Sequence, residues 1–386
     1  MSTNEEYHGS HFHEATFINQ NGELQTSKIP VVQELAREGL TNQFPKRFIT
    51  LPQRGQLNDT VILETPPVID IANLKHNDTR KMELQKLAEA AKEWGVFLIK
   101  NHGVDDTVLD DVKDVVKGFF SLSFEEKKVN VGTYRSVDNM GYGKSHVKSE
   151  DQPLDWVDRL TIKAAPVDES TNHLRVWPRK PTNFRQSIEK YVEKSRKVLD
   201  VLLEDLAESI ALDKNAFLQY FEPQQSEIKV RVNYYPPCPR PDLAVGILPH
   251  SDPSGVTLLL ELGATGSLQV QKGMGWATLQ WPNNNNLLVN IGDLLEIMSN
   301  GMLKSAWHQV RTQLDVERIS LAYFYNPPPQ CEIGPTVNSG SMEEIYKKVV
   351  VEDYVSHLYK ISPTTSKEAI MYAKDLTPYN LVTSAE

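Results

Sequence analysis

The sequence predicts a mainly β protein with flanking helices, in which antiparallel strands form a sandwich or closed barrel of the jelly-roll type. From about residue 227 onward, short runs rich in β-branched and aromatic residues follow one another at regular intervals. Turn residues separate these runs, which is the pattern of all-β sandwiches and barrels. Earlier in the chain, longer stretches carry apolar residues at helical spacing, so helices are expected beside the β core.

The 386 residues divide into four predicted parts. Residues 1–28 are polar and are expected to form a flexible tail. Residues 29–215 are expected to form a helix-rich region, and residues 216–340 the β core. Residues 341–386 are predicted to hold a C-terminal helical segment and tail. One all-β unit with its helices accounts for this length.

The helix-rich region contains alternating helix and strand signals. A short amphipathic helix is expected over 29–39, and strands over PPVIDIANL (66–74) and the apolar run GVFLIKNHG (95–103). Helical spacing predicts further helices at 78–94, 104–120 and 184–212.

The β core is a series of short strand signals with turns between them. The strands are expected at residues 229–235, 243–252, 255–261, 266–271, 276–281, 286–291, 294–299, 307–312 and 318–325. A last helical segment, over about 341–370, is expected to pack outside this core.

The composition excludes some classes of partner. The net charge of −10 argues against nucleic acid and anionic membranes, because phosphate binding needs a basic surface. No run approaches the roughly 20 apolar residues of a membrane span. The N-terminal residues match neither a signal peptide nor a transit peptide, so a cytoplasmic protein is expected. Cys238 and Cys331 are interpreted as free thiols in a reducing compartment, although one disulfide is formally possible.

Two histidines and one aspartate form the candidate metal site. His250 and Asp252 stand two apart in HSDPSG, so they share a face if the strand continues through them. His308 follows in SAWHQV, far enough along the chain to lie on a neighbouring strand. Taken singly, each residue has a simpler explanation as a surface or core side chain. Together they are the ligand set of the facial triad that holds non-haem Fe(II) and leaves coordination positions free.

A second polar group is predicted on two strands of the β core. Side chains two apart on a strand face the same way, and buried polar groups need partners. A bound acidic small molecule would supply them. The predicted inward sets are Arg318, Ser320, Ala322, Phe324 and Asn326 on one strand, and Arg231, Asn233 and Tyr235 on the other.

At these residues the chain resembles the plant Fe(II)- and 2-oxoglutarate-dependent dioxygenases, the family of flavonoid, gibberellin and alkaloid oxygenases. The resemblance covers about residues 28–372 and implies a double-stranded β-helix, a distorted jelly roll. Its catalytic-domain motifs are RVNYYPPCPRPDL (231–243), HSD (250–252), His308 and Arg318-Ile-Ser320. Its N-terminal motifs are PPVIDI (66–71), GVFLIKNHGV (95–104) and FFSLSFEEK (119–127).

The resemblance implies a role for each matching residue. His250, Asp252 and His308 match the iron ligands. Arg318 and Ser320 match the pair that binds the far carboxylate of 2-oxoglutarate, which suits the guanidinium fork. Tyr235 and Asn233 match side chains that contact the same co-substrate.

The prime substrate site is less defined by sequence. Phe324, Asn326 and Arg231 are expected to face it, and Tyr142, in NMGYG, is expected in a loop that closes over the pocket. Gln309 stands after His308 where the family commonly has arginine, and a change in hydrogen bonding around His308 is expected from it.

The resemblance implies that 2-oxoglutarate and O2 are used to hydroxylate or O-demethylate a small hydrophobic plant specialised metabolite, giving succinate and CO2. Ascorbate is the expected reductant, and a monomer is expected. Two alternatives stay open. One is an enzyme of the same scaffold with another reaction, such as an ascorbate-dependent oxidase or a condensing enzyme. The other is a non-catalytic ligand-binding barrel. The sequence does not encode the identity of the prime substrate.

Overall fold

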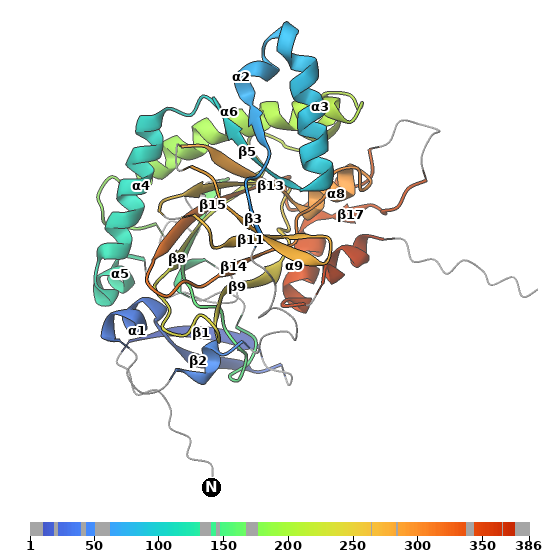
Figure 1. Ribbon diagram of the computed structural model, residues 1–386. Coiled ribbons are helices and arrows are strands. Elements are labelled where there is room, and N and C mark those ends of the chain that lie inside the picture. The colour runs from blue at the N-terminus through green and yellow to red at the C-terminus, as the bar shows by residue number, and fades with distance from the viewer. Residues whose placement is uncertain are drawn as a thin grey trace, which may run out of the picture.

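Two β-sheets packed face to face form the centre of the molecule (Figure 1). The larger sheet has the order β4 (Val68–Asp70), β5 (Val96–Lys100), β13 (Leu287–Ile291), β10 (Val256–Glu261), β15 (Arg318–Asn326), β8 (Glu227–Tyr235), β7 (Asp158–Ala165) and β6 (Gly141–Gly143). The smaller sheet has the order β3 (Ile62–Glu64), β12 (Gly275–Leu279), β11 (Leu268–Lys272), β14 (His308–Arg311) and β9 (Val245–His250). Neighbouring strands are antiparallel except for β4 with β5 and β3 with β12.

The structure is a computed structural model. It describes residues 11–18, 22–39, 44–50, 62–131, 140–143, 147–166, 177–263, 265–282, 285–336, 343–364 and 366–374.

Strand periodicity gives the larger sheet two different faces. On β10, Leu258 and Leu260 belong to the core beneath the helices, whereas Leu259 between them packs against the smaller sheet. On β15, Leu321 faces the helices and Ala322 faces the smaller sheet in the same way. This alternation follows from the two-residue repeat of a strand. The polar residues that share parity with Ala322 therefore lie between the sheets, as the sequence predicts.

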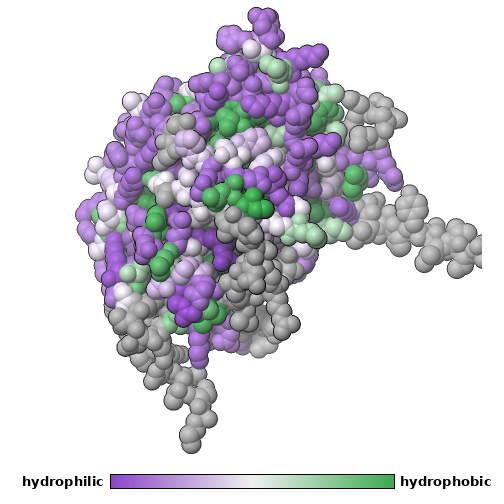
Figure 2. All heavy atoms as spheres, in the orientation of Figure 1, coloured by the Kyte–Doolittle hydropathy of each residue, from purple (hydrophilic) through white to green (hydrophobic). Residues whose placement is uncertain are grey.

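Helices cover the outer face of the larger sheet. Figure 1 shows α3, α4 and α6 around one side of the sheets, with α9 at the other side. In Figure 2 the surface over α2 and α3 is mostly hydrophilic, as expected of helices that bury only one face. The α-helices are α1 (Val32–Glu38), α2 (Ile71–Leu74), α3 (Asn77–Glu93), α4 (Asp106–Ser121), α5 (Phe124–Val131), α6 (Phe184–Ser209), α7 (Asn215–Leu218), α8 (Asp293–Met298) and α9 (Val351–Ile361). Shorter elements are the 3-10 helices Lys46–Phe48 and Glu368–Ala373 and the strand pair β16 (Glu332–Ile333) and β17 (Val349–Val350).

The N-terminal segment differs from the expected loose tail. Within its described part, β1 (Phe12–Ile18) and β2 (Leu24–Pro30) pair as an antiparallel hairpin. Asp158 at the start of β7 anchors the hairpin and α1, because its carboxylate accepts hydrogen bonds from the backbone N–H groups of Val32 (3.2 Å) and Gln33 (2.7 Å) and lies 3.3 Å from the His13 ring. Polar composition alone does not reveal such docking.

Residues 294–298 are helical, in place of the strand predicted over 294–299. They belong to α8 (Asp293–Met298), of which every residue is buried. Periodicity cannot separate a short buried helix from a short buried strand, because both are apolar throughout. The predicted C-terminal helix is also shorter than expected, since α9 covers only Val351–Ile361. No helix in the described ranges is long and apolar enough to cross a membrane.

Candidate active site

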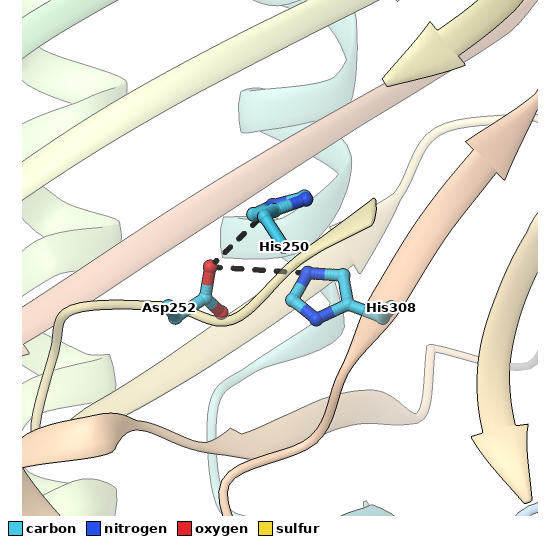
Figure 3. Close-up of side chains that lie close together, drawn as sticks. All are labelled: His250, Asp252 and His308. Carbon is cyan, nitrogen blue, oxygen red and sulfur yellow. Dashed lines mark ion pairs between the residues drawn. The ribbon is translucent and has the colours of Figure 1, made fainter. Parts of the chain in front are cut away.

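His250, Asp252 and His308 meet between the two sheets (Figure 3). Their potential ligand atoms all lie within 4.8 Å of one another. The Asp252 Oδ1 atom is 3.9 Å from His250 Nε2 and 3.8 Å from His308 Nε2. The two histidines are directly opposite each other on the antiparallel strands β9 and β14, which explains why residues so distant in sequence converge.

Backbone and side-chain contacts orient each member of this triad. His250 Nδ1 lies 2.9 Å from the Leu248 carbonyl and His308 Nδ1 lies 3.0 Å from the Ala306 carbonyl. These carbonyls hold the proton on Nδ1 and leave Nε2 free to bind a metal. The Asn290 amide donates to Asp252 Oδ2 at 3.2 Å, so Oδ1 remains directed at the histidines.

Electrostatics favour the metal-binding protonation states. Burial and, to a smaller extent, the neighbouring His308 lower the pKa of His250 to about 3. Burial acts to raise the pKa of Asp252, but the two histidines and the side-chain hydrogen bonds of Thr257 and Asn290 outweigh it, so this pKa lies below its usual range. At neutral pH the His250 imidazole is therefore neutral and the Asp252 carboxylate is ionised, and both states suit the binding of a divalent metal.

The strand does not continue through Asp252 as the parity argument assumed. β9 ends at His250, and the chain then turns. Asp252 is positioned instead by α8, since its carbonyl accepts from the Asp293 N–H at 2.8 Å. Ser251 donates to the Asp293 carboxylate at 2.9 Å, and the Tyr354 hydroxyl of α9 donates to the same carboxylate at 2.8 Å. The ligand loop is thus tied to the C-terminal helix.

The closed end of the pocket carries the second predicted polar group. Arg318, Ser320, Asn233 and Tyr235 all line the pocket that contains the triad. The Arg318 guanidinium lies 5.0 Å from the centre of the Tyr235 ring, its cross-strand neighbour. A Cβ at Gly246 would lie 2.9 Å from a Tyr235 ring carbon, so glycine is needed there to make room for the ring.

Arg318 has free hydrogen-bonding capacity although it is buried. One terminal nitrogen, Nη2, pairs with Glu261, whereas Nε and Nη1 have no partner among the described residues. Buried N–H groups without partners are costly, and a guanidinium offers two parallel donors to a carboxylate. This end of the pocket therefore fits the carboxylate of a small acid such as 2-oxoglutarate.

Several polar side chains at or beside the pocket were missed in the sequence analysis. Arg159 and Asp155 form a 2.8 Å ion pair in the pocket wall, and Arg159 Nε donates to the Asn233 side chain at 3.2 Å. The signal was present, because residues 158–165 alternate polar and apolar as a strand does. Glu261 shares strand parity with the inward Leu259, and Asn290 is a polar residue inside an apolar strand run.

The mouth of the pocket includes the C-terminal segment. Phe324, Asn326 and Arg231 line the pocket as predicted. Arg231 lies 5.5 Å from the centre of the Phe324 ring and donates through Nε to Thr161 at 3.2 Å. Asn326 Oδ1 instead accepts from the Gly255 N–H at 3.3 Å, which braces the loop after Asp252. The C-terminal residues of the wall are Val355, Leu358, Tyr359, Ser362, Pro363, Thr364, Ser366, Lys367 and Ala369.

Tyr142 does not take part in the site, which corrects the prediction of a pocket-closing loop. Its side chain is 2% exposed and packs in the core beside Phe119 and His13, at ring-centre distances of 5.7 and 4.9 Å. β6 pairs with β7 at the edge of the larger sheet, and this pairing turns the tyrosine inward. Sequence position in a glycine-rich stretch does not distinguish a loop from a short edge strand.

Gln309 also lies away from the triad. Its amide donates to the Gln269 side chain of β11 at 2.8 Å, on the opposite face of the strand from His308. The His308 ring is oriented by the Ala306 carbonyl, and the hydrogen bond of the Gln309 amide goes to Gln269 and not to that ring.

Comparisons with known families match two regions of the chain. Residues 66–180 match the model of the non-haem dioxygenase N-terminal region in morphine synthesis. Residues 227–327 match the 2OG-Fe(II) oxygenase superfamily. The second match contains the triad, Arg318 and Ser320.

Relatives and solved structures match over most of the chain. Codeine O-demethylase from Papaver somniferum is 39% identical over 80% of this chain and 85% of its own length. An oxoglutarate-dependent flavonoid 7-O-demethylase from Ocimum basilicum is 35% identical over 86% of this chain and 87% of its own. The crystal structure of JOX2 in complex with 2OG, Fe and JA superposes with a TM-score of 0.79 at 30% identity, covering 90% of this chain and 98% of JOX2. These likenesses confirm the predicted family resemblance and the double-stranded β-helix fold.

Proposed function

Because the chain belongs to the 2OG-Fe(II) oxygenase superfamily, we propose that it hydroxylates or O-demethylates a small hydrophobic plant metabolite. The observation that carries this proposal is a single pocket with two unlike ends. The triad lies beside a buried arginine with unpaired N–H groups, and apolar side chains continue from there to the mouth. A co-substrate acid and an apolar substrate can therefore reach the same metal.

The chain's own residues bind and orient the reactants in this proposal. His250, Asp252 and His308 would hold Fe(II), and Arg318 with Ser320 would bind the far carboxylate of 2-oxoglutarate. Bound Fe(II) supplies the oxygen chemistry that converts 2-oxoglutarate to succinate and CO2 while the prime substrate is oxidised. The intact carboxylate site at Arg318 favours this reaction over an ascorbate-dependent oxidase or condensing enzyme on the same scaffold.

The pocket walls favour an aromatic substrate with an acidic or phenolic group. Leu259, Ala322 and Phe324 form apolar wall on the larger sheet, and Phe324 offers a ring for stacking. The Arg231 guanidinium has no carboxylate partner among the described residues, although it is only partly exposed. An anionic or phenolic oxygen would supply that partner. The two demethylase relatives support O-methyl removal from such a ring.

Succinate release tests the proposal. The purified protein is given Fe(II), ascorbate, 2-oxoglutarate and O2 with a panel of O-methylated flavonoids and alkaloids and their acidic analogues. We expect substrate-dependent succinate, with formaldehyde where an O-methyl carbon is attacked. No succinate across the panel, together with unchanged iron affinity in Asp252→Ala, would overturn the oxygenase assignment.

We also propose that the protein acts as a monomer in the cytoplasm with ascorbate as its reductant. Both cysteines, Cys238 and Cys331, are free thiols, which suits a reducing compartment. Size-exclusion chromatography with light scattering tests the first point, and omission of ascorbate from the assay tests the last.

A further inference from the structure

Glu261 occupies an unusual place for a carboxylate, because it pairs with the arginine that is to bind another carboxylate. Glu261 is the last residue of β10, and its side chain is on the same face of the strand as those of the pocket-lining Thr257 and Leu259. Its side chain is 3% exposed and its backbone is directly opposite Ser320. One of its oxygens pairs with Arg318 Nη2, and the other, Oε2, has no hydrogen-bond partner in the part of the chain that is described.

We propose that Glu261 is a positioning residue of the co-substrate site, and that it takes up one proton from solvent when 2-oxoglutarate binds at Arg318. This inference rests on the proposed function and adds to it a proton that accompanies co-substrate binding. In the free protein Glu261 holds the guanidinium in place as an ion pair. In the complex it remains beside Arg318 as a neutral acid.

The expected protonation of Glu261 follows from the balance of charges around the buried Arg318. A guanidinium has five N–H groups, so Arg318 can serve Glu261 and an incoming carboxylate together through Nη2 on one side and Nε with Nη1 on the other. One positive charge would then be shared by two negative charges in a buried place. Two carboxylates in one site favour protonation of one of them. Glu261 is the one that burial already disposes to protonation, since burial raises its pKa above the usual range despite Arg318.

The other titratable groups at this end leave that balance unchanged. Arg159 and Asp155 neutralise each other as a 2.8 Å ion pair. Tyr235 lies against Arg318 from β8, and burial raises its pKa, so its hydroxyl stays neutral. Ser320 is uncharged. Arg318 is thus the charged group that faces both Glu261 and the incoming carboxylate.

The proposal predicts how co-substrate affinity depends on pH. In the complex Glu261 is protonated, whereas in the free protein it is ionised above its pKa. Binding of 2-oxoglutarate then requires a proton, so the affinity falls as pH rises through the pKa of Glu261 in the free protein. The dissociation constant then rises by up to about tenfold per pH unit, until pH reaches the higher pKa in the complex. Glu261→Gln keeps the shape and the acceptor for Arg318 but cannot ionise. We expect it to bind 2-oxoglutarate with a nearly constant affinity, and several-fold more tightly than the wild type at pH 8.

Calorimetry measures the proton directly. The Fe(II) protein is titrated with 2-oxoglutarate under nitrogen at pH 6.5, 7.5 and 8.5, in pairs of buffers that differ in ionisation enthalpy. We expect proton uptake close to one per 2-oxoglutarate at pH 8.5 in the wild type and none in Glu261→Gln. Glu317→Gln is the matched control, because Glu317 precedes Arg318 but is exposed and accepts from the Tyr234 hydroxyl at 2.6 Å. It should behave as the wild type does.

The outcomes separate this inference from the proposed function. If 2-oxoglutarate binds to the wild type without proton uptake, Glu261 does not protonate and the inference is wrong, whereas the proposed function stands. If Glu261→Gln binds 2-oxoglutarate more weakly than the wild type at every pH, the inference is also wrong. Glu261 would then only hold Arg318 in position. If 2-oxoglutarate does not bind the wild type at all, the proposed function itself fails.

Discussion

The two ends of the pocket are built in different ways. At the closed end, most of the side chains come from neighbouring strands at fixed register, and hydrogen bonds orient members of the triad, such as His308 by Ala306 and Asp252 by Asn290. At the mouth, the wall includes α9 and the irregular segment after it, and much of the lining is apolar. From this difference we expect the closed end to control whether the reaction runs, and the mouth to control which molecule is oxidised.

Asp252→Ala is the most severe test of the closed end. It removes one of three ligands and leaves the metal with two histidines, so we expect iron affinity and succinate formation to fall by more than about 100-fold, beyond the usual effect of losing an outer contact. Iron content after dialysis and succinate yield measure this. Asp242→Asn is a control, since Asp242 is exposed and pairs only with Arg240. Normal iron retention in Asp252→Ala would show that Asp252 is not needed for metal binding, and the contrast between the two ends of the pocket would then fail.

Arg318→Leu tests co-substrate binding separately from metal binding. Loss of a buried, charge-assisted contact costs about 2–4 kcal/mol, which corresponds to a rise of roughly 30-fold to 1000-fold in the KM for 2-oxoglutarate. Iron content should not change. The variant also leaves Glu261 buried without its partner, so the double variant Arg318→Leu/Glu261→Leu is measured beside it to separate binding from folding. An unchanged KM would remove Arg318 from the site.

Arg231→Gln tests whether the mouth of the pocket binds the substrate independently of the closed end. For an acidic or phenolic substrate, loss of the charged contact is expected to cost about 1–2 kcal/mol and to raise the substrate KM roughly 5-fold to 30-fold. The KM for 2-oxoglutarate should stay the same, and so should the KM for a neutral analogue of the substrate. A parallel rise in both co-substrate and substrate KM would show that the two ends are not independent.

Tyr142→Phe is expected to have the smallest effect. The Tyr142 hydroxyl is buried without a hydrogen-bond partner among the described residues, and Tyr142 does not line the pocket. Its removal should leave both KM values unchanged and alter the free energy of unfolding by no more than about 1 kcal/mol, in the stabilising direction. Chemical denaturation and steady-state kinetics check this. A change in the KM for the substrate alone would show that Tyr142 contributes to substrate binding.

The same division explains how much the sequence could predict. Residues at the closed end are readable because strand parity and ligand chemistry constrain them together, as for Arg318 with Ser320 and His250 with His308. Glu261 and Asn290 were open to the same argument, but each stands in a predicted strand whose other residues are mostly apolar. Site roles at the closed end remain predictions until the variants are measured, although the geometry agrees with them.

The mouth was harder to predict for a physical reason. Its residues come from segments whose position depends on tertiary contacts, such as the 2.6 Å ion pair between Lys367 and Glu296 that holds the segment after α9. Tyr142 was misplaced because an edge strand of three residues has too little sequence to show a period. α8 was misread because full burial removes the period altogether.

The docked N-terminal hairpin has a practical consequence for where the protein can be cut. The family match begins at residue 66, yet Trp156 lies against Phe44 and Phe48, with ring centres 5.2 and 5.3 Å away, and shares their cluster with residues of the hairpin and α1. A fragment that starts at the family boundary would leave this indole uncovered on the side that those rings occupy. The stretch ahead of the recognised family region is therefore part of the folding unit, and a soluble fragment has to keep it.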